Sequence, residues 1–102
     1  MVAALAIEPN SALVHHNLGG ALLRKGEAAG AVRAFRAALA SNPRFAESHA
    51  ALGFALLTQE RLAEARASLR NSLRLLPGKH SLRAFSAREL RKCEALLALG
   101  PT

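Results

Sequence analysis

The feature that most constrains the fold of this chain is a tandem repeat. Residues 12–45 (ALVHHNLGGALLRKGEAAGAVRAFRAALASNPRF) recur as residues 46–79 (AESHAALGFALLTQERLAEARASLRNSLRLLPGK). The identical pairs include His15/His49, Leu18/Leu52, Gly19/Gly53, Ala21/Ala55, Leu22/Leu56, Leu23/Leu57, Ala31/Ala65, Leu39/Leu73 and Pro43/Pro77. A period of this length is typical of a stacked array, in which each unit buries its apolar face against its neighbours.

Each unit predicts two helices. In the first half, Val14, Leu18 and Leu22 recur every four residues and make an apolar stripe, which Gly26 ends. The second half has a similar stripe that Asn42 and Pro43 end, because proline cannot continue a helix. We therefore expect helices at about 11–25, 28–41, 45–58 and 61–75. The short loops between them predict antiparallel neighbours.

The order of small and large residues resembles the tetratricopeptide repeat, a helix–turn–helix unit with the same period. The first copy carries it at Leu18, Gly19, Leu22, Ala31, Phe35, Ala38 and Pro43, and the second at Leu52, Gly53, Leu56, Ala65, Leu69, Ser72 and Pro77. His15 and His49 stand where this family often has a large aromatic residue, and Ser72 replaces a small apolar one. The resemblance implies an all-α fold, an antiparallel helix–turn–helix solenoid. Six side chains should then be almost fully buried: Leu18, Leu22, Phe35, Leu52, Leu56 and Leu69.

The segments outside the two units predict a partial repeat and a cap. Pro9 is in phase with Pro43, so residues 1–9 are interpreted as the second half of a truncated repeat, and the chain as a fragment of a longer array. Leu5, Ile7, Leu13 and Val14 would then expose apolar surface through which the chain could self-associate. Residues 80–99 predict a C-terminal capping helix, because Ser81 can cap its start and no Gly or Pro interrupts it before Leu99.

The C-terminal segment LLPGKHSLRAFSARELRKCEALLAL carries a second resemblance. It resembles the end of the helical-repeat tails of some bacterial serine/threonine protein kinases. The sequence contains neither the glycine-rich loop nor the His-Arg-Asp segment of a kinase domain.

Composition bounds the cellular setting. A length of 102 residues allows one domain, and no apolar stretch approaches the length needed to span a membrane. The N-terminal residues lack the basic start and the cleavage region of a secretory signal. The single cysteine, Cys93, cannot form an internal disulfide, which suits a reducing compartment, so we expect a cytoplasmic protein.

The net charge of +7 is concentrated in residues 61–92, where nine basic side chains stand against two acidic ones. Arg66, Arg70 and Arg74 recur every four residues and would form a row along one helix face. A nucleic-acid-binding helix would show such a row, and a basic helical domain that binds nucleic acid is our alternative prediction. The lack of Trp and Tyr for base stacking favours a solvated outer face instead.

Catalytic and metal-binding motifs are weak in this sequence. His15 and His49 could form a metal pair across neighbouring repeats, but zinc needs three or four ligands, so we favour packing histidines. Cys93 and His80 would lie about 20 Å apart if they share one helix, too far for a nucleophile and its base. We predict no enzyme, no cofactor and no metal site.

The resemblance implies a concave groove for a peptide or partner helix, lined by the first helix of each unit. Carried over by position, the wall contains Leu13, His16, Asn17, Gly20, Leu23, Arg24, Glu47, Ala50, Ala51, Phe54, Leu57 and Thr58, continued by Ser81, Ala84, Arg88 and Arg91. Of the residues with which some family members clamp acidic chaperone tails, only Asn17 is present, so we predict no such clamp. An apolar centre with a basic far end predicts an amphipathic helix or an apolar-acidic peptide as partner.

Overall fold

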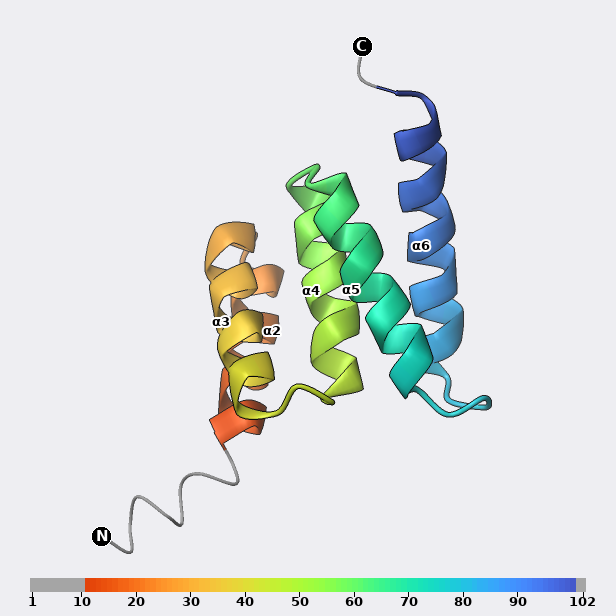
Figure 1. The fold of residues 1–102 in the computed structure, drawn as a ribbon. Coiled ribbons are helices and arrows are strands. Elements are labelled where there is room, and N and C mark those ends of the chain that lie inside the picture. Colours follow the sequence, from red (N-terminus) through yellow and green to blue (C-terminus); the bar gives the residue numbers. More distant parts are fainter. Residues whose placement is uncertain (1–10, 101–102) are drawn as a thin grey trace, which may run out of the picture.

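The computed structural model describes residues 11–100, which form five helices and no strand (Figure 1). The helices are α2 Ser11–Arg24, α3 Ala28–Ser41, α4 Ala46–Thr58, α5 Leu62–Leu75 and α6 Leu82–Ala98. The all-α class is confirmed, and the four helices expected inside the repeat begin and end within one residue of these bounds. The predicted half-repeat at residues 1–9 lies outside the described residues.

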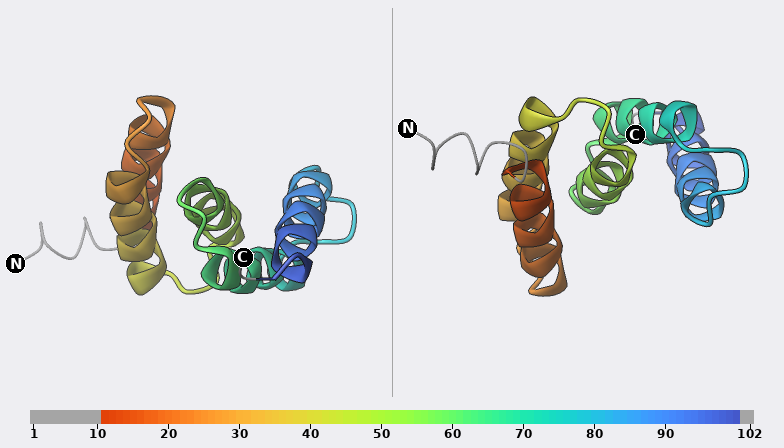
Figure 2. Two further views of the ribbon diagram at one scale, coloured as in Figure 1. Left: turned by 90° about the horizontal axis from the view of Figure 1, so that it is seen from above. Right: turned by 90° about the horizontal axis from the view of Figure 1, so that it is seen from below.

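The helices alternate in direction along the chain. Figure 1 shows α2, α4 and α6 running one way and α3 and α5 running the other. Each helix packs against the next one in the sequence, and α4 also contacts α2 and α6. The views along the helices in Figure 2 place α4 between the α2–α3 pair and α6. The three helices of the first set therefore meet on one side of the molecule.

The turn inside each unit has the same backbone geometry in both copies. Gly26 and Glu60 stand one repeat period apart, and both have positive φ angles, 82° and 61°. In each turn, the next amide donates a hydrogen bond back to a helix carbonyl, that of Leu22 or Leu56, at 2.9 Å. This is a Schellman ending, for which glycine is suited and glutamate is not. The second turn therefore repeats the shape of the first with a strained residue.

The two helices of each unit approach each other at a glycine. A Cβ atom placed on Gly19 would lie 2.6 Å from Cε1 of Phe35, and one placed on Gly53 would lie 2.6 Å from Cγ of Leu69. Both distances are far inside normal carbon contacts. Because Phe35 and Leu69 are 1 % and 0 % exposed, neither side chain has free space to move away. Glycine therefore sets the spacing of the helices in both units.

One hydrophobic core connects both units and the last helix. Its buried members are Ala31, Val32, Phe35, Leu52, Ala55, Leu56, Ala65 and Cys93. Phe35 belongs to the first unit, Leu56 to the second and Cys93 to α6. Burial of this shared apolar surface stabilises all three parts together.

The predicted burial is confirmed for four of the six large side chains, namely Phe35, Leu52, Leu56 and Leu69. Leu22 is only partly buried, and the prediction is wrong for Leu18, which is 49 % exposed. Leu52, the equivalent of Leu18 one unit later, shares a core cluster with Phe35 because α3 packs against α4. Among the described residues, no helix packs on the corresponding outer face of α2.

Polar contacts attach α6 to the second unit. The buried hydroxyl groups of Ser72 and Ser86 lie 2.9 Å apart and share a hydrogen bond. Arg83 Nη1 donates to the carbonyl oxygens of Leu73 and Leu76, at 2.6 and 3.1 Å, and so caps the C-terminal end of α5. Ser72, which replaces the small apolar residue of the repeat pattern, thus forms a hydrogen bond with a second buried serine, Ser86.

The start of α6 differs from the prediction. Ser81 makes no capping hydrogen bond with its side chain, and the N–H of Leu82 donates instead to Nδ1 of His80, at 3.0 Å. His80 precedes α6, so the expectation that it shares a helix with Cys93 is wrong. The imidazole supplies the acceptor that the sequence pattern assigned to serine.

Candidate functional site

A groove with a volume of about 330 Å³ opens where α2, α4 and α6 meet. Eight described residues line it: His16 and Leu23 from α2, Glu47, Ala50, Ala51 and Phe54 from α4, and Leu82 and Phe85 from α6. The groove thus collects side chains from three helices that are separated in the sequence. A volume of this size accommodates one or two large side chains of a ligand.

The centre of the groove is apolar. The rings of Phe54 and Phe85 lie with their centroids 5.9 Å apart and their planes tilted by 50°, an arrangement that aromatic pairs prefer. Both rings are only partly buried, and Leu23 and Leu82 lie in the same wall. Water over these surfaces would be released when an apolar side chain of a ligand covers them, which contributes about 25 cal/mol per Å² of apolar surface before the entropy cost of association is subtracted.

One end of the groove is held by His16. Its Nδ1 lies 2.8 Å from Oγ of the buried Ser48, and its ring stacks on Phe45 with centroids 4.9 Å apart. Burial lowers the pKa of His16 from its ordinary value of 6.5, and the carboxylate of Glu47 opposes this shift only in part. His16 is therefore a neutral, fixed part of the wall near neutral pH.

Glu47 supplies the charged group of the lining. Its Oε2 lies 3.8 Å from Nε2 of His80, which approaches from the loop before α6. The Glu47 side chain is 46 % exposed, so solvent and a ligand can both reach the carboxylate. His80 therefore approaches Glu47 from the loop without covering its carboxylate.

The structure brings together six of the sixteen residues that the sequence assigned to the groove. His16, Leu23, Glu47, Ala50, Ala51 and Phe54 line the cavity. The other ten do not belong to its lining. They are the exposed Leu13, Asn17, Arg24, Thr58, Ser81, Ala84, Arg88 and Arg91, the partly buried Gly20, and Leu57, which packs on the core. Arg88 and Arg91 follow Phe85 by about one and two helical turns.

Leu82 and Phe85 were missed by the reasoning from sequence, although the repeat carried a signal for both. Phe85 stands one period after Ala51, which the sequence did assign to the wall, and Leu82 stands one period after Ser48. Because α6 continues the direction of α4, equivalent positions face the same side. The repeat phase was carried into this helix for Ser81, Ala84, Arg88 and Arg91, and carrying it over from Ala51 as well would have found Phe85.

The outer face of α2 carries the most exposed apolar residues of the first unit. Leu13, Val14 and Leu18 are 52 %, 60 % and 49 % exposed. A shallow depression of about 370 Å³ beside them is lined by His15, Leu18 and Leu22 of α2 and by residues of α3. Val14 and Leu18 lie about one helical turn apart and do not belong to the lining of the groove, and they are here named the α2 outer row.

His49 has a structural partner. Its Nε2 donates to the carbonyl oxygen of Pro43 at 2.8 Å, so it holds the loop that enters α4. Arg83, which takes the same place one period later, likewise donates to backbone carbonyls at the end of α5. Within residues 11–100, no three His, Cys, Asp or Glu side chains gather as metal ligands. The contacts of His49 support the packing interpretation over the metal pair.

Cys93 is buried in the core. Its Sγ donates to the carbonyl oxygen of Leu62 at 3.0 Å. Burial raises the pKa of the thiol, and the charge of Arg66 opposes this shift only in part. A protonated, inaccessible thiol is a poor nucleophile, and Cys93 instead packs in the shared hydrophobic core.

Glu89 is a buried carboxylate in α6, at the position that Ala55 occupies one period earlier. It is 4 % exposed, and its Oε1 has no hydrogen-bond donor among the described residues. Nζ of Lys92 lies 3.2 Å from Oε1 outside hydrogen-bonding geometry, and Nε of Arg88 lies 3.7 Å from Oε2. Both cations are more than half exposed, so they compensate the buried charge incompletely.

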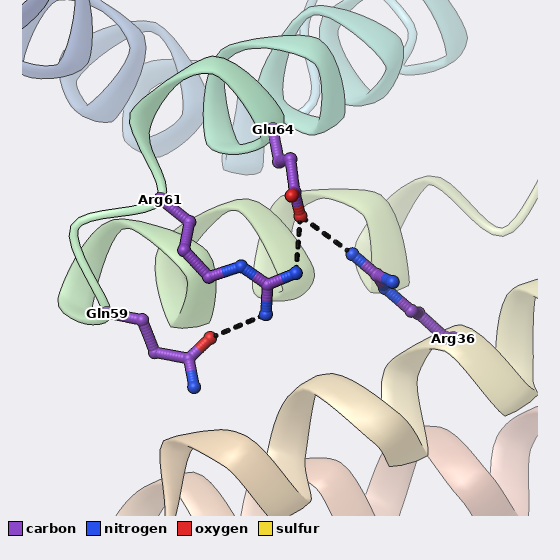
Figure 3. A network of polar contacts seen from close by, with 4 residues as sticks. All are labelled: Arg36, Gln59, Arg61 and Glu64. Atoms are coloured by element: carbon purple, nitrogen blue, oxygen red, sulfur yellow. Dashed lines mark hydrogen bonds and ion pairs between the residues drawn. The ribbon is translucent and has the colours of Figure 1, made fainter.

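On the side of the molecule where α3 and α5 lie, arginines form ion pairs with acidic side chains of the same chain. Figure 3 shows Glu64 of α5 accepting from Arg36 of α3 at 3.0 Å and from Arg61 at 2.7 Å, and Arg61 also donates to Gln59 at 3.1 Å. Exposed pairs of this kind contribute about 0–1 kcal/mol each. The network joins the second helices of the two units.

The three arginines of the predicted row are only partly available to bind a ligand. Arg66 is partly buried, Arg70 pairs with Glu94 of α6 at 2.9 Å, and Arg74 donates to Asn71 at 2.8 Å. Each partner reduces what these side chains can offer to a phosphate backbone. The row thus serves in part to hold α6 against α5.

Comparison with known proteins adds no relative: no protein-family model matches the sequence, and no curated protein matches it. In residues 11–100, none of the helices has both the length and the apolar character that a membrane crossing requires.

Proposed function

We propose that this chain is a protein-binding module of the tetratricopeptide-repeat type. In this proposal, residues 12–45 and 46–79 are two stacked repeats, residues 80–99 are the capping helix, and the groove holds a peptide or a partner helix. The observation that carries it is the apolar groove of about 330 Å³ formed by α2, α4 and α6, with Phe54 and Phe85 at its centre. Concave apolar sites with a few polar groups are the usual places of ligand binding.

Two further observations support the repeat assignment. The glycine contacts Gly19–Phe35 and Gly53–Leu69 are equivalent across one period, and so are the left-handed turns at Gly26 and Glu60. A backbone that repeats its turn with an unsuitable residue favours a shared architecture over a chance likeness in sequence.

Peptide display against the purified chain tests this function. The change Phe54→Gln removes half of the aromatic pair, and Leu18→Gln makes the same kind of change on the α2 outer row. We expect enriched peptides to lose about tenfold or more in affinity with Phe54→Gln, the equivalent of about 1.4 kcal/mol, and little with Leu18→Gln. Far-UV circular dichroism checks that both variants remain folded.

Failure to enrich any peptide, or binding that is indifferent to Phe54, would contradict the proposal.

A salt titration with nonspecific duplex DNA tests the alternative of a nucleic-acid-binding domain. Tight binding at low salt that weakens steeply as salt rises would favour that alternative. The pairing of Arg70 with Glu94 and of Arg36 and Arg61 with Glu64 leads us to expect weak DNA binding.

A further inference from the structure

The electrostatic character of the groove is opposite in sign to that of the whole chain. The formal net charge is +7, yet the charged residue among the described groove lining is Glu47. The nearest polar neighbour in the lining, His16, is fixed by Ser48 and Phe45 and stays neutral near neutral pH because burial lowers its pKa. A ligand in the groove therefore meets an anion at this end.

The basic side chains outside the groove give little information about the charge of a ligand that binds in the groove. Arg36 and Arg61 pair with Glu64, Arg70 pairs with Glu94, and Arg83 donates to backbone carbonyls. Exposed charges farther than about 8 Å from a ligand are largely screened at physiological ionic strength. A side chain in contact with Glu47 therefore responds to that carboxylate more than to the net charge.

The spacing of the two parts of the groove defines the ligand further. Glu47 and Phe54 lie two turns apart on one helix, which is about 10 Å along its axis. A ligand helix presents side chains with the same separation at positions i and i+7, two turns apart on one face. One such position can reach Glu47 while the other enters the cavity that Phe54 and Phe85 line.

We propose that the groove selects a helical peptide segment that carries a bulky apolar side chain against Phe54 and Phe85 and a Lys or Arg side chain at Glu47. This specificity rests on the peptide-binding function proposed above. It replaces the expectation of an apolar-acidic ligand, which relied on net charge and on Arg88 and Arg91. Those two arginines follow the apolar centre along α6, outside the cavity lining.

His80 does not occupy the place of the ligand cation. Its Nε2 is 3.8 Å from one oxygen of Glu47, and the carboxylate has several lone-pair sites. With the side chain of Glu47 46 % exposed, a lysine or arginine can approach from the open side of the groove. Glu47 would then bridge the loop before α6 and the ligand.

Three peptides that differ at one position test the proposal. Each is a helix of about 16 residues with one Phe and, two helical turns away at i+7, Lys, Gln or Glu. Each is made in both chain orders, because the groove does not define the direction of the ligand. Affinities are measured by fluorescence anisotropy with the unmodified chain, with Glu47→Gln, and with the control Glu27→Gln, whose carboxylate lies on the α3 side of the outer depression.

We expect the Lys peptide to bind about threefold to tenfold more tightly than the Glu peptide, as for an exposed ion pair replaced by like charges. Glu47→Gln should reduce this ratio to about one while Phe-dependent binding remains, and Glu27→Gln should leave the ratio unchanged. Equal or tighter binding of the Glu peptide to the unmodified chain would overturn the charge preference and leave the peptide-binding function standing. If none of the peptides binds, both proposals fail.

Discussion

Two adjacent glycines in α2 allow a stringent test of the fold, because the same change should have opposite effects at each. A Cβ atom at Gly19 would lie 2.6, 2.7 and 2.8 Å from three ring atoms of Phe35. At Gly20 the nearest atom to an added Cβ would be Nη1 of Arg24, at 3.8 Å. Gly20→Ala therefore meets open space and a flexible side chain, whereas Gly19→Ala meets a fixed ring.

The magnitudes follow from these distances. Alanine is more favourable than glycine inside a helix by about 0.5–1 kcal/mol, and Gly20→Ala should raise the free energy of unfolding by this amount. Gly19→Ala gains the same amount but forces the ring of Phe35, 1 % exposed, to shift, and overpacking of this kind costs about 1–3 kcal/mol. The two variants should therefore differ by about 1–3 kcal/mol, with Gly20→Ala the more stable.

Urea unfolding followed by circular dichroism measures both variants, and a mutant cycle with Phe35→Ala identifies the clash. Phe35→Ala alone should cost about 3–5 kcal/mol and leave a marginal protein, so the cycle needs a stabilising osmolyte. In that background, Gly19→Ala should no longer be destabilising, since its partner ring is absent. Equal stability of Gly19→Ala and Gly20→Ala would refute the assigned packing of α2 on α3.

Four further changes test other parts of the structure. Glu60→Gly relieves the left-handed glutamate and should stabilise the chain by up to about 1 kcal/mol in urea unfolding; a loss of stability would show that the turn is unstrained. Glu89→Leu removes a buried, incompletely paired charge and should raise the free energy of unfolding by about 1 kcal/mol in the same assay; a decrease would show that the pairs with Lys92 and Arg88 outweigh the desolvation of Glu89. The folded-state pKa of His16 lies below its unfolded value of 6.5, so the unfolded chain binds this proton more readily than the folded chain. The contribution of His16 to the free energy of unfolding is therefore complete above pH 6.5 and is lost as the pH falls below that value. His16→Gln should weaken the acid sensitivity of the urea midpoint, and an equal effect of the control His15→Gln would contradict this assignment. Leu18→Glu on the α2 outer row should reduce self-association in sedimentation velocity, whereas the same change at Leu99, 73 % exposed at the other end, should not.

The local features of the fold could be predicted from the sequence because they depend on residues close together in the chain. The helix bounds follow from the apolar spacing, from Gly26 and from the two Pro positions that end the units, and the described helices agree within one residue. The repeat period also placed Gly19 and Gly53 at equivalent positions, and in the structure each lies where its helix approaches a large side chain, Phe35 or Leu69. Helix bounds and the contacts inside one unit depend only on the local backbone geometry and on the sizes of the side chains.

Burial of the end residues could not be predicted in the same way. Leu18 and Leu52 occupy identical places in the pattern, yet one is 49 % exposed and the other 6 % exposed. The difference arises because α3 covers α4, while no described helix covers the outer face of α2. A repeat pattern specifies which face is apolar, but exposure depends on which neighbour is present.

The groove depended most on the tertiary structure. The sequence identified the α2 and α4 walls through repeat phase, and it placed a basic wall on α6 where the structure has Leu82 and Phe85. The approach of His80 to Glu47 and of His16 to Ser48 joins residues that lie nearly one repeat period apart in the chain. Periodicity describes one helix at a time, whereas the charge and shape of a groove arise from side chains that different helices bring within a few ångströms of one another.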